Sequence, residues 1–209
     1  SSEGSTLTAT GTGTRLTVES NTAGQGGGGI YFTTGADVLI KIGAIVVIQK
    51  NTATSFYGGG VYLQNEGSTF SVTGDNTRVT VESNTAGQRG GGVYSGFGAD
   101  VMVESGAALV VQKNTATSLN GGGMYLFNEG STFSVTGNST RVTIESNTAG
   151  QLGGGMFSSA GADVMVESGG ALVVQKNTAT SQHGGGVYLQ DKDSTFSATG
   201  LNTSVAVES

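Results

Sequence analysis

Short runs of alternating apolar and polar residues recur along the whole chain. Two neighbouring runs, Thr69–Thr73 and Arg78–Glu82, alternate with period two, as a strand with one buried face does. A third run, Val61–Leu63, follows three glycines, and no window has helical periodicity. We therefore predict an all-β fold with Thr80 and Val110 on the outside. The residues expected in the core are Phe70, Val72, Val79, Val81, Val101, Val103, Leu109 and Val111.

These runs belong to a long internal repeat. Residues 51–113 recur as residues 114–176 with 13 substitutions and no gap. Each 63-residue unit splits into related halves of 33 and 30 residues that open with Asn-Thr-Ala. Three strands per half-repeat without hairpin signals predict a parallel β-helix (β-solenoid) with one coil per half-repeat, and right-handed crossovers are the rule for parallel strands.

The repeat divides the chain into about seven coils of one solenoid, residues 1–209. We expect a partial coil at 1–20 and coils at 21–50, 51–83, 84–113, 114–146, 147–176 and 177–209. Residues 1–7 align with the middle of a repeat, so the segment is expected to be part of a longer array.

The doubled period has an electrostatic explanation. In a one-coil repeat, identical glutamates would stack about 4.8 Å apart, which is destabilising. Here Glu82 and Glu145 alternate with Gln112, and Asp100 alternates with threonines at the equivalent position of the neighbouring coils. This alternation predicts that each carboxylate lies beside an uncharged polar side chain of the adjacent coil.

One asparagine recurs at the start of every half-repeat. We expect its side-chain amides to hydrogen-bond to one another in an internal ladder at a corner of the coil, with the following Thr and Ala filling the turn. The glycines would allow close backbone approach there. The ladder consists of Asn21, Asn51, Asn84, Asn114, Asn147 and Asn177.

The composition and charge of the chain exclude several kinds of site and partner. The chain has 38 Gly, no Cys and a net charge of −6. Without cysteine there is no disulfide or thiolate–metal site, and the negative charge argues against nucleic acid as a partner. No apolar stretch is long enough to cross a membrane, so we expect no membrane insertion by this segment. We expect no cofactor.

The junction between half-repeats resembles the polymorphic outer membrane proteins of the chlamydial type. In that family an apolar or aromatic residue, two further residues and Asn precede a Gly-Gly-Ala-Ile-like segment. Here residues 48–51, Ile-Gln-Lys-Asn, precede Gly58-Gly59-Gly60-Val61, and the pairing recurs in all six complete coils. The chain departs from the family in having Ile or Val for the usual Phe, and Gly for Ala. The resemblance implies an exported right-handed β-helix at a cell surface, often adhesive.

An aromatic residue follows the glycines in every coil. If the preceding aliphatic residue faces the core, the aromatic faces out, where it could stack on sugars or on another fibre. Alternatively the row stabilises its own stack or faces inward. The row consists of Tyr31, Tyr62, Tyr94, Tyr125, Phe157 and Tyr188.

The turn before the glycines is the most variable part of the repeat. Loops tolerate variation and also carry function, so the turn is either unconstrained or a contact edge. The candidate contact residues are Phe56, Tyr57, Arg89, Leu119, Leu152 and His183.

The sequence pattern gives little support for a catalytic or a metal site. The aspartates at 37, 100 and 163 recur as a ladder, whereas a glycosidase needs two carboxylates on either side of one bond in a cleft. The single histidine, His183, lies in a variable turn and does not suggest a triad. A threonine row could bind ice, but arginines flank it. We predict no catalytic, cofactor or metal residues.

The pattern is therefore typical of a non-catalytic structural segment in an extracellular or cell-surface fibre or adhesin. The segment is expected to act as a rod and in lateral or end-to-end contacts. The expected partner is the protein itself, through further repeats or other copies, and a further partner is cell-surface glycans or the surface of a host or neighbouring cell. The alternative is a polysaccharide-binding or polysaccharide-degrading β-helix, and an ice-binding protein is a weaker reading.

Overall fold

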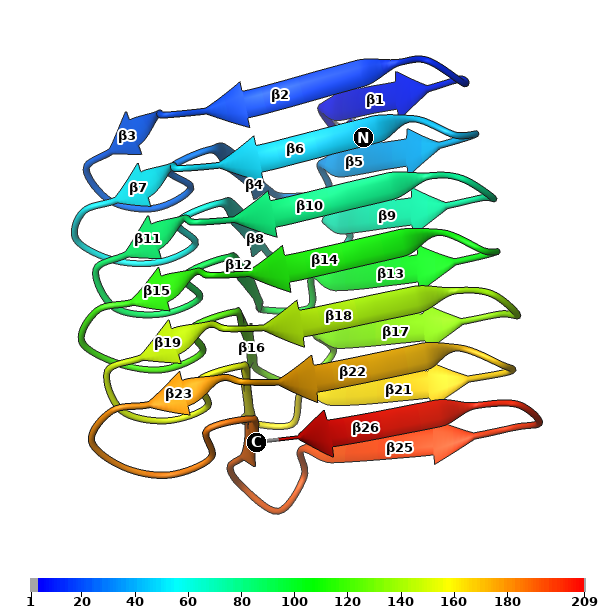
Figure 1. The fold of residues 1–209 in the computed structure, drawn as a ribbon. Helices are drawn as coiled ribbons and strands as arrows, with labels where there is room; N and C mark the ends of the chain where they lie inside the picture. Colours follow the sequence, from blue (N-terminus) through cyan, green and yellow to red (C-terminus); the bar gives the residue numbers. More distant parts are fainter. Residues whose placement is uncertain (1–3, 209) are drawn as a thin grey trace.

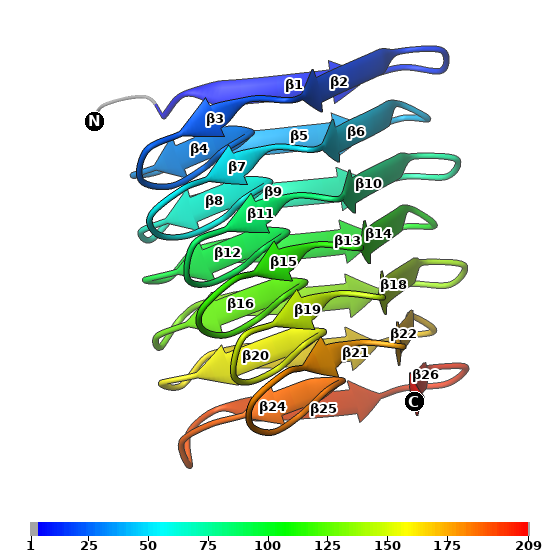
Figure 2. The same ribbon diagram turned by 60° about the vertical axis from the view of Figure 1, so that its left-hand side comes forward.

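A computed structural model describes residues 4–208, and it shows a stack of coils with four parallel sheets running along its length (Figures 1 and 2). Every strand pair within residues 4–208 is parallel. The predicted parallel β-helix is thus confirmed. Over the same range no helix has the length and apolarity that a membrane crossing requires. Positions 1–3 of the predicted partial coil and position 209 of the last coil lie outside the described residues.

Two seven-stranded sheets form the long sides of each coil. The first consists of β1 (Thr6–Thr10), β5 (Asp37–Lys41), β9 (Thr69–Thr73), β13 (Asp100–Glu104), β17 (Thr132–Thr136), β21 (Asp163–Glu167) and β25 (Thr195–Thr199). The second consists of β2 (Arg15–Glu19), β6 (Ile45–Gln49), β10 (Arg78–Glu82), β14 (Ala108–Gln112), β18 (Arg141–Glu145), β22 (Ala171–Gln175) and β26 (Ser204–Glu208).

Two six-stranded sheets complete each coil. One is built from two-residue strands: β3 (Thr22–Ala23), β7 (Thr52–Ala53), β11 (Thr85–Ala86), β15 (Thr115–Ala116), β19 (Thr148–Ala149) and β23 (Thr178–Ala179). The other consists of β4 (Ile30–Thr33), β8 (Val61–Gln64), β12 (Val93–Gly96), β16 (Met124–Phe127), β20 (Met156–Ser159) and β24 (Val187–Leu189).

Each coil therefore has four strands, and the prediction of three was wrong in this detail. The Thr-Ala dipeptide was expected to fill a turn. It instead pairs with the same dipeptide of the next coil: the Thr52 amide donates to the Asn21 carbonyl at 2.9 Å, and the Thr54 amide donates to the Ala23 carbonyl at 2.9 Å. A segment this short carries too little periodicity to be recognised as a strand from sequence.

The inward faces of the strands form one continuous apolar core. All eight residues predicted to be inside are fully buried. Thr80 and Val110 lie on the outer face and are half-buried, also as predicted. The period-two alternation of the two long sheets thus sets which side chains the coil encloses.

Adjacent coils differ in the lengths of their turns. In the 33-residue coil that starts at Asn51, the turns after β7, β8 and β9 have seven, four and four residues; in the next, 30-residue coil the equivalent turns have six, three and three. Long and short turns interlock: the Gly43 amide of a short turn donates to Thr77 Oγ1 of the long turn below it at 2.9 Å, and Gly106 donates likewise to Thr140 at 2.9 Å.

Candidate functional site: the aromatic stack and its cover

The asparagine ladder occupies the corner between the second long sheet and the two-residue strands. Asn51 donates from its backbone amide and from Nδ2 to Asn84 Oδ1, at 2.9 and 3.0 Å, and a second Nδ2 proton goes to the Val18 carbonyl at 2.9 Å. The bonds from one asparagine to the next recur from Asn21 to Asn177, and the Nδ2 bond to a backbone carbonyl recurs from Asn51 to Asn177. The central amides are fully buried and make all the hydrogen bonds that an asparagine side chain can make.

The glycine triplets pass directly over this corner. A Cβ on Gly28 would lie 2.5 Å from the Thr52 carbonyl carbon, and one on Gly60 would lie 2.9 Å from Asn84 Nδ2. Because any side chain there would collide with the Asn-Thr-Ala segment, the glycines let the loop fold back against it. The two sequence motifs of the repeat, Asn-Thr-Ala and the glycine triplet, thus pack against each other.

The aromatic residues after the glycines stack on one another along the solenoid. Consecutive rings from Tyr31 to Tyr188 have centroids 4.9 to 5.7 Å apart and are within 11° of parallel. The rings from Tyr62 to Tyr188 belong to a second apolar cluster, separate from the main core. We call this row the aromatic stack.

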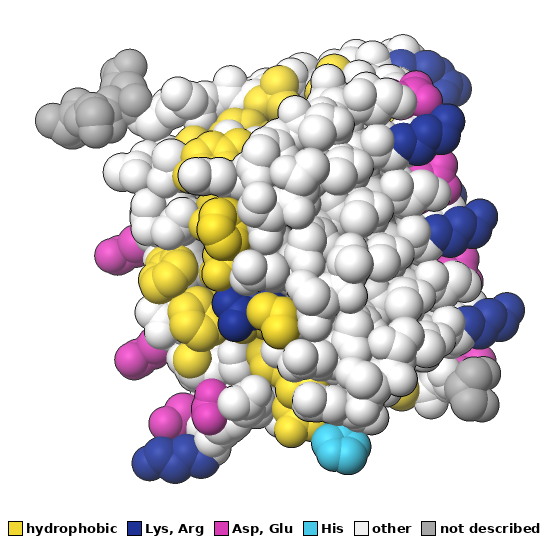
Figure 3. Space-filling view, turned by 90° about the vertical axis from the view of Figure 1, so that its left-hand side faces the viewer, with side chains coloured by type: hydrophobic (Ala, Val, Ile, Leu, Met, Phe, Trp, Pro, Cys, Tyr) yellow, Lys and Arg dark blue, Asp and Glu magenta, His cyan; other side chains and the backbone are white. Residues whose placement is uncertain are grey.

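The residues before the glycine triplets cover the aromatic stack from outside. Tyr57 and Leu152 pack against it. Arg89 lies between rings, with Cζ 5.4 Å from the Tyr57 centroid and 5.5 Å from the Tyr125 centroid, and Nη1 donates to Tyr57 Oη at 3.2 Å. We call these residues the cover row. In the space-filling view a stripe of hydrophobic side chains runs down this face, and the histidine lies at the surface (Figure 3).

The cover changes the chemistry of the phenols. Burial raises the pKa of Tyr62 to about 12, and the neighbouring Tyr31 and Tyr57 hydroxyls contribute in the same direction. Burial raises the pKa of Tyr94 and of Tyr125 as well. Burial thus favours the neutral form of these three phenols.

The outer faces of the long sheets carry hydrogen-bonded polar ladders. Thr132 Oγ1 donates to Asp100 Oδ1 at 2.6 Å, and Gln112 Nε2 donates to Glu82 Oε2 at 2.7 Å. Lys50 and Glu19 form an ion pair at 3.1 Å, which lowers the pKa of Glu19. The register sets Glu82 opposite Gln112 and Gln112 opposite Glu145, which confirms the predicted alternation of carboxylates with uncharged polar side chains.

The comparisons with known proteins agree with this geometry. A family model described as "Right handed beta helix region" matches residues 7–202. The chain belongs to the right-handed β-helix family. No curated protein matched the chain, and no solved structure did. Membership of the family confirms the expected handedness of this β-helix.

Of the two alternatives for the aromatic row of this β-helix, the structure favours a row that stabilises its own stack over an exposed contact surface. The exposed fractions of Tyr62, Tyr94, Tyr125 and Phe157 are 7, 2, 4 and 1%. Their side chains form a cluster separate from the main core, with Tyr57 and Leu152 of the preceding loops packed against it. In the ribbon, the loop that leads into each strand of this sheet curls back beside the strand (Figure 2). Tyr31, at 53%, is exposed and Tyr188 is half-buried.

The candidate contact residues of the variable turns also divide into half-buried and exposed ones. Tyr57, Arg89 and Leu152 are half-buried and serve the cover row, and Leu119 is half-buried too. Phe56 and His183 remain exposed on this face of the β-helix. Sequence reasoning missed the cover itself, although loops of six or seven residues carrying three glycines beside an invariant aromatic position were a usable signal.

The repeated acidic residues on the outer face of the β-helix form hydrogen-bonded ladders between coils. The Asp100 and Asp163 carboxylates accept hydrogen bonds from threonines of the next coil at 2.6 Å, so the repeated acids of the β-helix hold coils together. No group of three or more His, Asp or Glu able to hold a metal is found within residues 4–208.

Proposed function

We propose that this β-helix is a non-catalytic rod, a structural segment of an extracellular or cell-surface fibre or adhesin. The observation that carries the proposal is the unbroken register of the Asn ladder and the aromatic stack through successive coils. Each two-coil unit contacts its neighbours through the same bonds, so length can be added in units of two coils without changing any local contact.

The surface position of the rod rests on its resemblance to the polymorphic outer membrane proteins. A rod of this kind would hold an adhesive or assembling part at a distance from the cell. The partners it implies are further repeats, other copies of the protein and cell-surface glycans. A polysaccharide-degrading β-helix is less well supported, because the repeated carboxylates already serve bonds between coils.

The rod proposal predicts that length follows coil number. Deleting residues 114–176 joins Lys113 to Asn177, which reproduces the natural Lys-Asn junction at 176–177. Small-angle scattering should show a particle shorter by about 10 Å, since two coils are lost at about 4.8 Å each, with an unchanged β-sheet circular dichroism spectrum. Unfolding of the deleted variant, or an unchanged length, would contradict a modular rod.

The surface location needs its own measurement. Antibodies raised against this chain should label intact cells of the source organism without permeabilisation, and negative-stain microscopy of the native material should show extended particles. Labelling that appears only after the cells are opened would refute the location without affecting the rod.

A further inference from the structure

The cover row has one vacancy. Its six positions are aligned by backbone hydrogen bonds in which the first glycine of each triplet donates to the cover residue of the next coil, at 3.0 to 3.1 Å. Five positions carry a side chain and the first, Gly26, carries none. The cover row consists of Gly26, Tyr57, Arg89, Asn120, Leu152 and His183.

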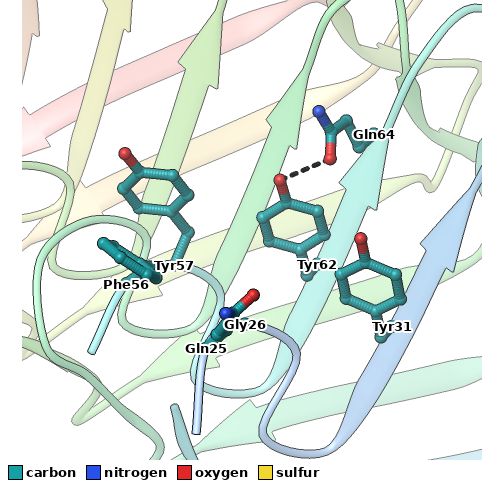
Figure 4. Close-up of a pocket in the computed structure, with 7 residues that line it drawn as sticks. All are labelled: Gln25, Gly26, Tyr31, Phe56, Tyr57, Tyr62 and Gln64. Atoms are coloured by element: carbon teal, nitrogen blue, oxygen red, sulfur yellow. Dashed lines mark hydrogen bonds between the residues drawn. The ribbon is translucent and has the colours of Figure 1, made fainter. Parts of the chain in front are cut away.

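The vacancy at Gly26 is a cavity of about 220 Å³ against the aromatic stack. A Cβ on Gly26 would lie 3.1 Å from the Tyr57 carbonyl oxygen and 3.2 Å from the Tyr62 ring, tight contacts that a shift of a few tenths of an ångström would relieve, and no positive φ at this residue requires a glycine. The cavity lies where the missing side chain would extend (Figure 4). Its other lining residues are Gln25, Tyr31, Phe56, Tyr57, Tyr62 and Gln64.

The walls of the cavity combine aromatic rings with uncharged polar groups. The Tyr57 ring is within 8° of parallel to the Tyr62 ring with centroids 6.3 Å apart, and Tyr31 stacks on Tyr62 at 4.9 Å. Tyr62 donates its hydroxyl to Gln64 Oε1 at 2.6 Å, a bond drawn in Figure 4. A ligand would therefore meet ring faces and edges together with phenol and amide groups.

The chain itself shows what fills the equivalent place two coils further on. Arg89 puts its guanidinium within cation–π distance of two tyrosine rings, and Nη1 donates to the Tyr57 phenol oxygen. Its buried Nε has no hydrogen-bond partner, so the rings and one phenol are what hold this cation in place. The Gly26 cavity offers the same kinds of partner, including the Tyr57 ring itself. No lining residue is charged, and the chain has a net charge of −6, which attracts a cation.

We propose that the cavity at Gly26 is a docking site for the guanidinium group of an arginine on a partner protein. The arginine inserts in the gap of the cover row and lies against the Tyr57 and Tyr62 rings, as Arg89 lies against its own two rings. The site is separate from the rod proposal, because filling it changes neither the register nor the length of the solenoid.

The test is a titration of the intact chain, with the tyrosine ring resonances followed by nuclear magnetic resonance. The probe is N-acetyl-arginine amide, and N-acetyl-lysine amide carries the same charge without the planar fork. We expect the resonances of Tyr31, Tyr57 and Tyr62 to shift, with a dissociation constant at least about five-fold lower for the arginine probe. The rings of Tyr94 and Tyr125 should not respond.

Two variants separate docking from general charge attraction. Gly26→Leu places in the gap the side chain that Leu152 already carries in the cover row, and Gly26→Ala is a smaller filling; both should abolish the shifts. Arg89→Ala opens the matching place, so methylguanidinium should raise its melting temperature more than that of the unmodified chain.

Several results would overturn the proposal. Equal affinity for the arginine and lysine probes would mean simple charge attraction. Shifts with methyl glucoside and none with the arginine probe would make the cavity a sugar site. Shifts that persist in both Gly26 variants, or failure of methylguanidinium to stabilise Arg89→Ala, would show that the rings do not select a guanidinium.

Discussion

Removing one rung of the asparagine ladder should destabilise the whole chain. In Asn84→Ala the side-chain amide is lost from a fully buried site. Its oxygen accepts from the Asn51 backbone amide and from Asn51 Nδ2, and its nitrogen donates to the Ile48 carbonyl at 2.9 Å and to Asn114 Oδ1 at 3.0 Å. The hydrogen bond that the Asn84 backbone amide donates to Asn114 Oδ1 remains.

The expected cost follows from the groups left without a partner. The substitution orphans two buried donors on Asn51 and the Ile48 carbonyl. Each unsatisfied buried group costs about 1–3 kcal/mol, and at the lower end for each we expect a loss of about 3 kcal/mol. Asn84→Asp keeps the shape but turns an oxygen toward two acceptors in a buried place, so it should cost at least as much.

Urea unfolding followed by circular dichroism measures this loss. The control is Asn138→Ala, which makes the same chemical change at an exposed turn and should stay within about 0.5 kcal/mol of the unmodified chain. If Asn84→Ala and Asn138→Ala lose the same stability, the buried ladder does not hold the coils and the reasoning fails.

Three other substitutions or conditions probe the remaining contacts. Gly28→Ala should prevent folding or greatly lower the urea midpoint, because its Cβ would be 2.5 Å from the Thr52 backbone, whereas Gly24→Ala, with open space around it, should be tolerated. Stability should fall as the pH rises from about 10 to about 12. The folded-state pKa of Tyr62 is raised, so the unfolded chain releases that proton first, and a pH series of urea midpoints tests this window. Gln112→Glu should set three carboxylates in adjacent coils and remove the hydrogen bond from Gln112 to Glu82, at a cost of about 0.5–1 kcal/mol or more. Salt at 1 M should restore the part due to repulsion, and no recovery would exclude repulsion as a cause.

The parts of the fold that could be predicted from sequence are those with a strong period. Two-residue alternation identifies β9 and β10 with their observed bounds, because a strand with one buried face must alternate. The regular return of Asn-Thr-Ala indicates a ladder, because a repeat at this spacing stacks like on like. The first inference rests on a period within one strand and the second on a period from coil to coil.

The glycines beside a recurring aromatic position signal that a loop approaches closely, but the path of that loop, and with it the cover row, could not be predicted from the sequence. Whether Tyr94 is exposed depends on the path of residues 87–92, which have no period of their own. The glycines indicate that a close approach occurs but not which surface is approached. The role of Arg89 was missed for the same reason, since an arginine in a variable turn ordinarily points into solvent.

The interlocking of long and short turns limits how such a gene can grow or shrink. A short-turn amide such as that of Gly106 finds its acceptor only on a long-turn threonine such as Thr140. Loss or gain of a single coil would place two turns of equal length together and leave that donor without its acceptor. Unequal recombination should therefore be tolerated in even numbers of coils, so natural length variants of this protein are expected to differ by whole multiples of 63 codons.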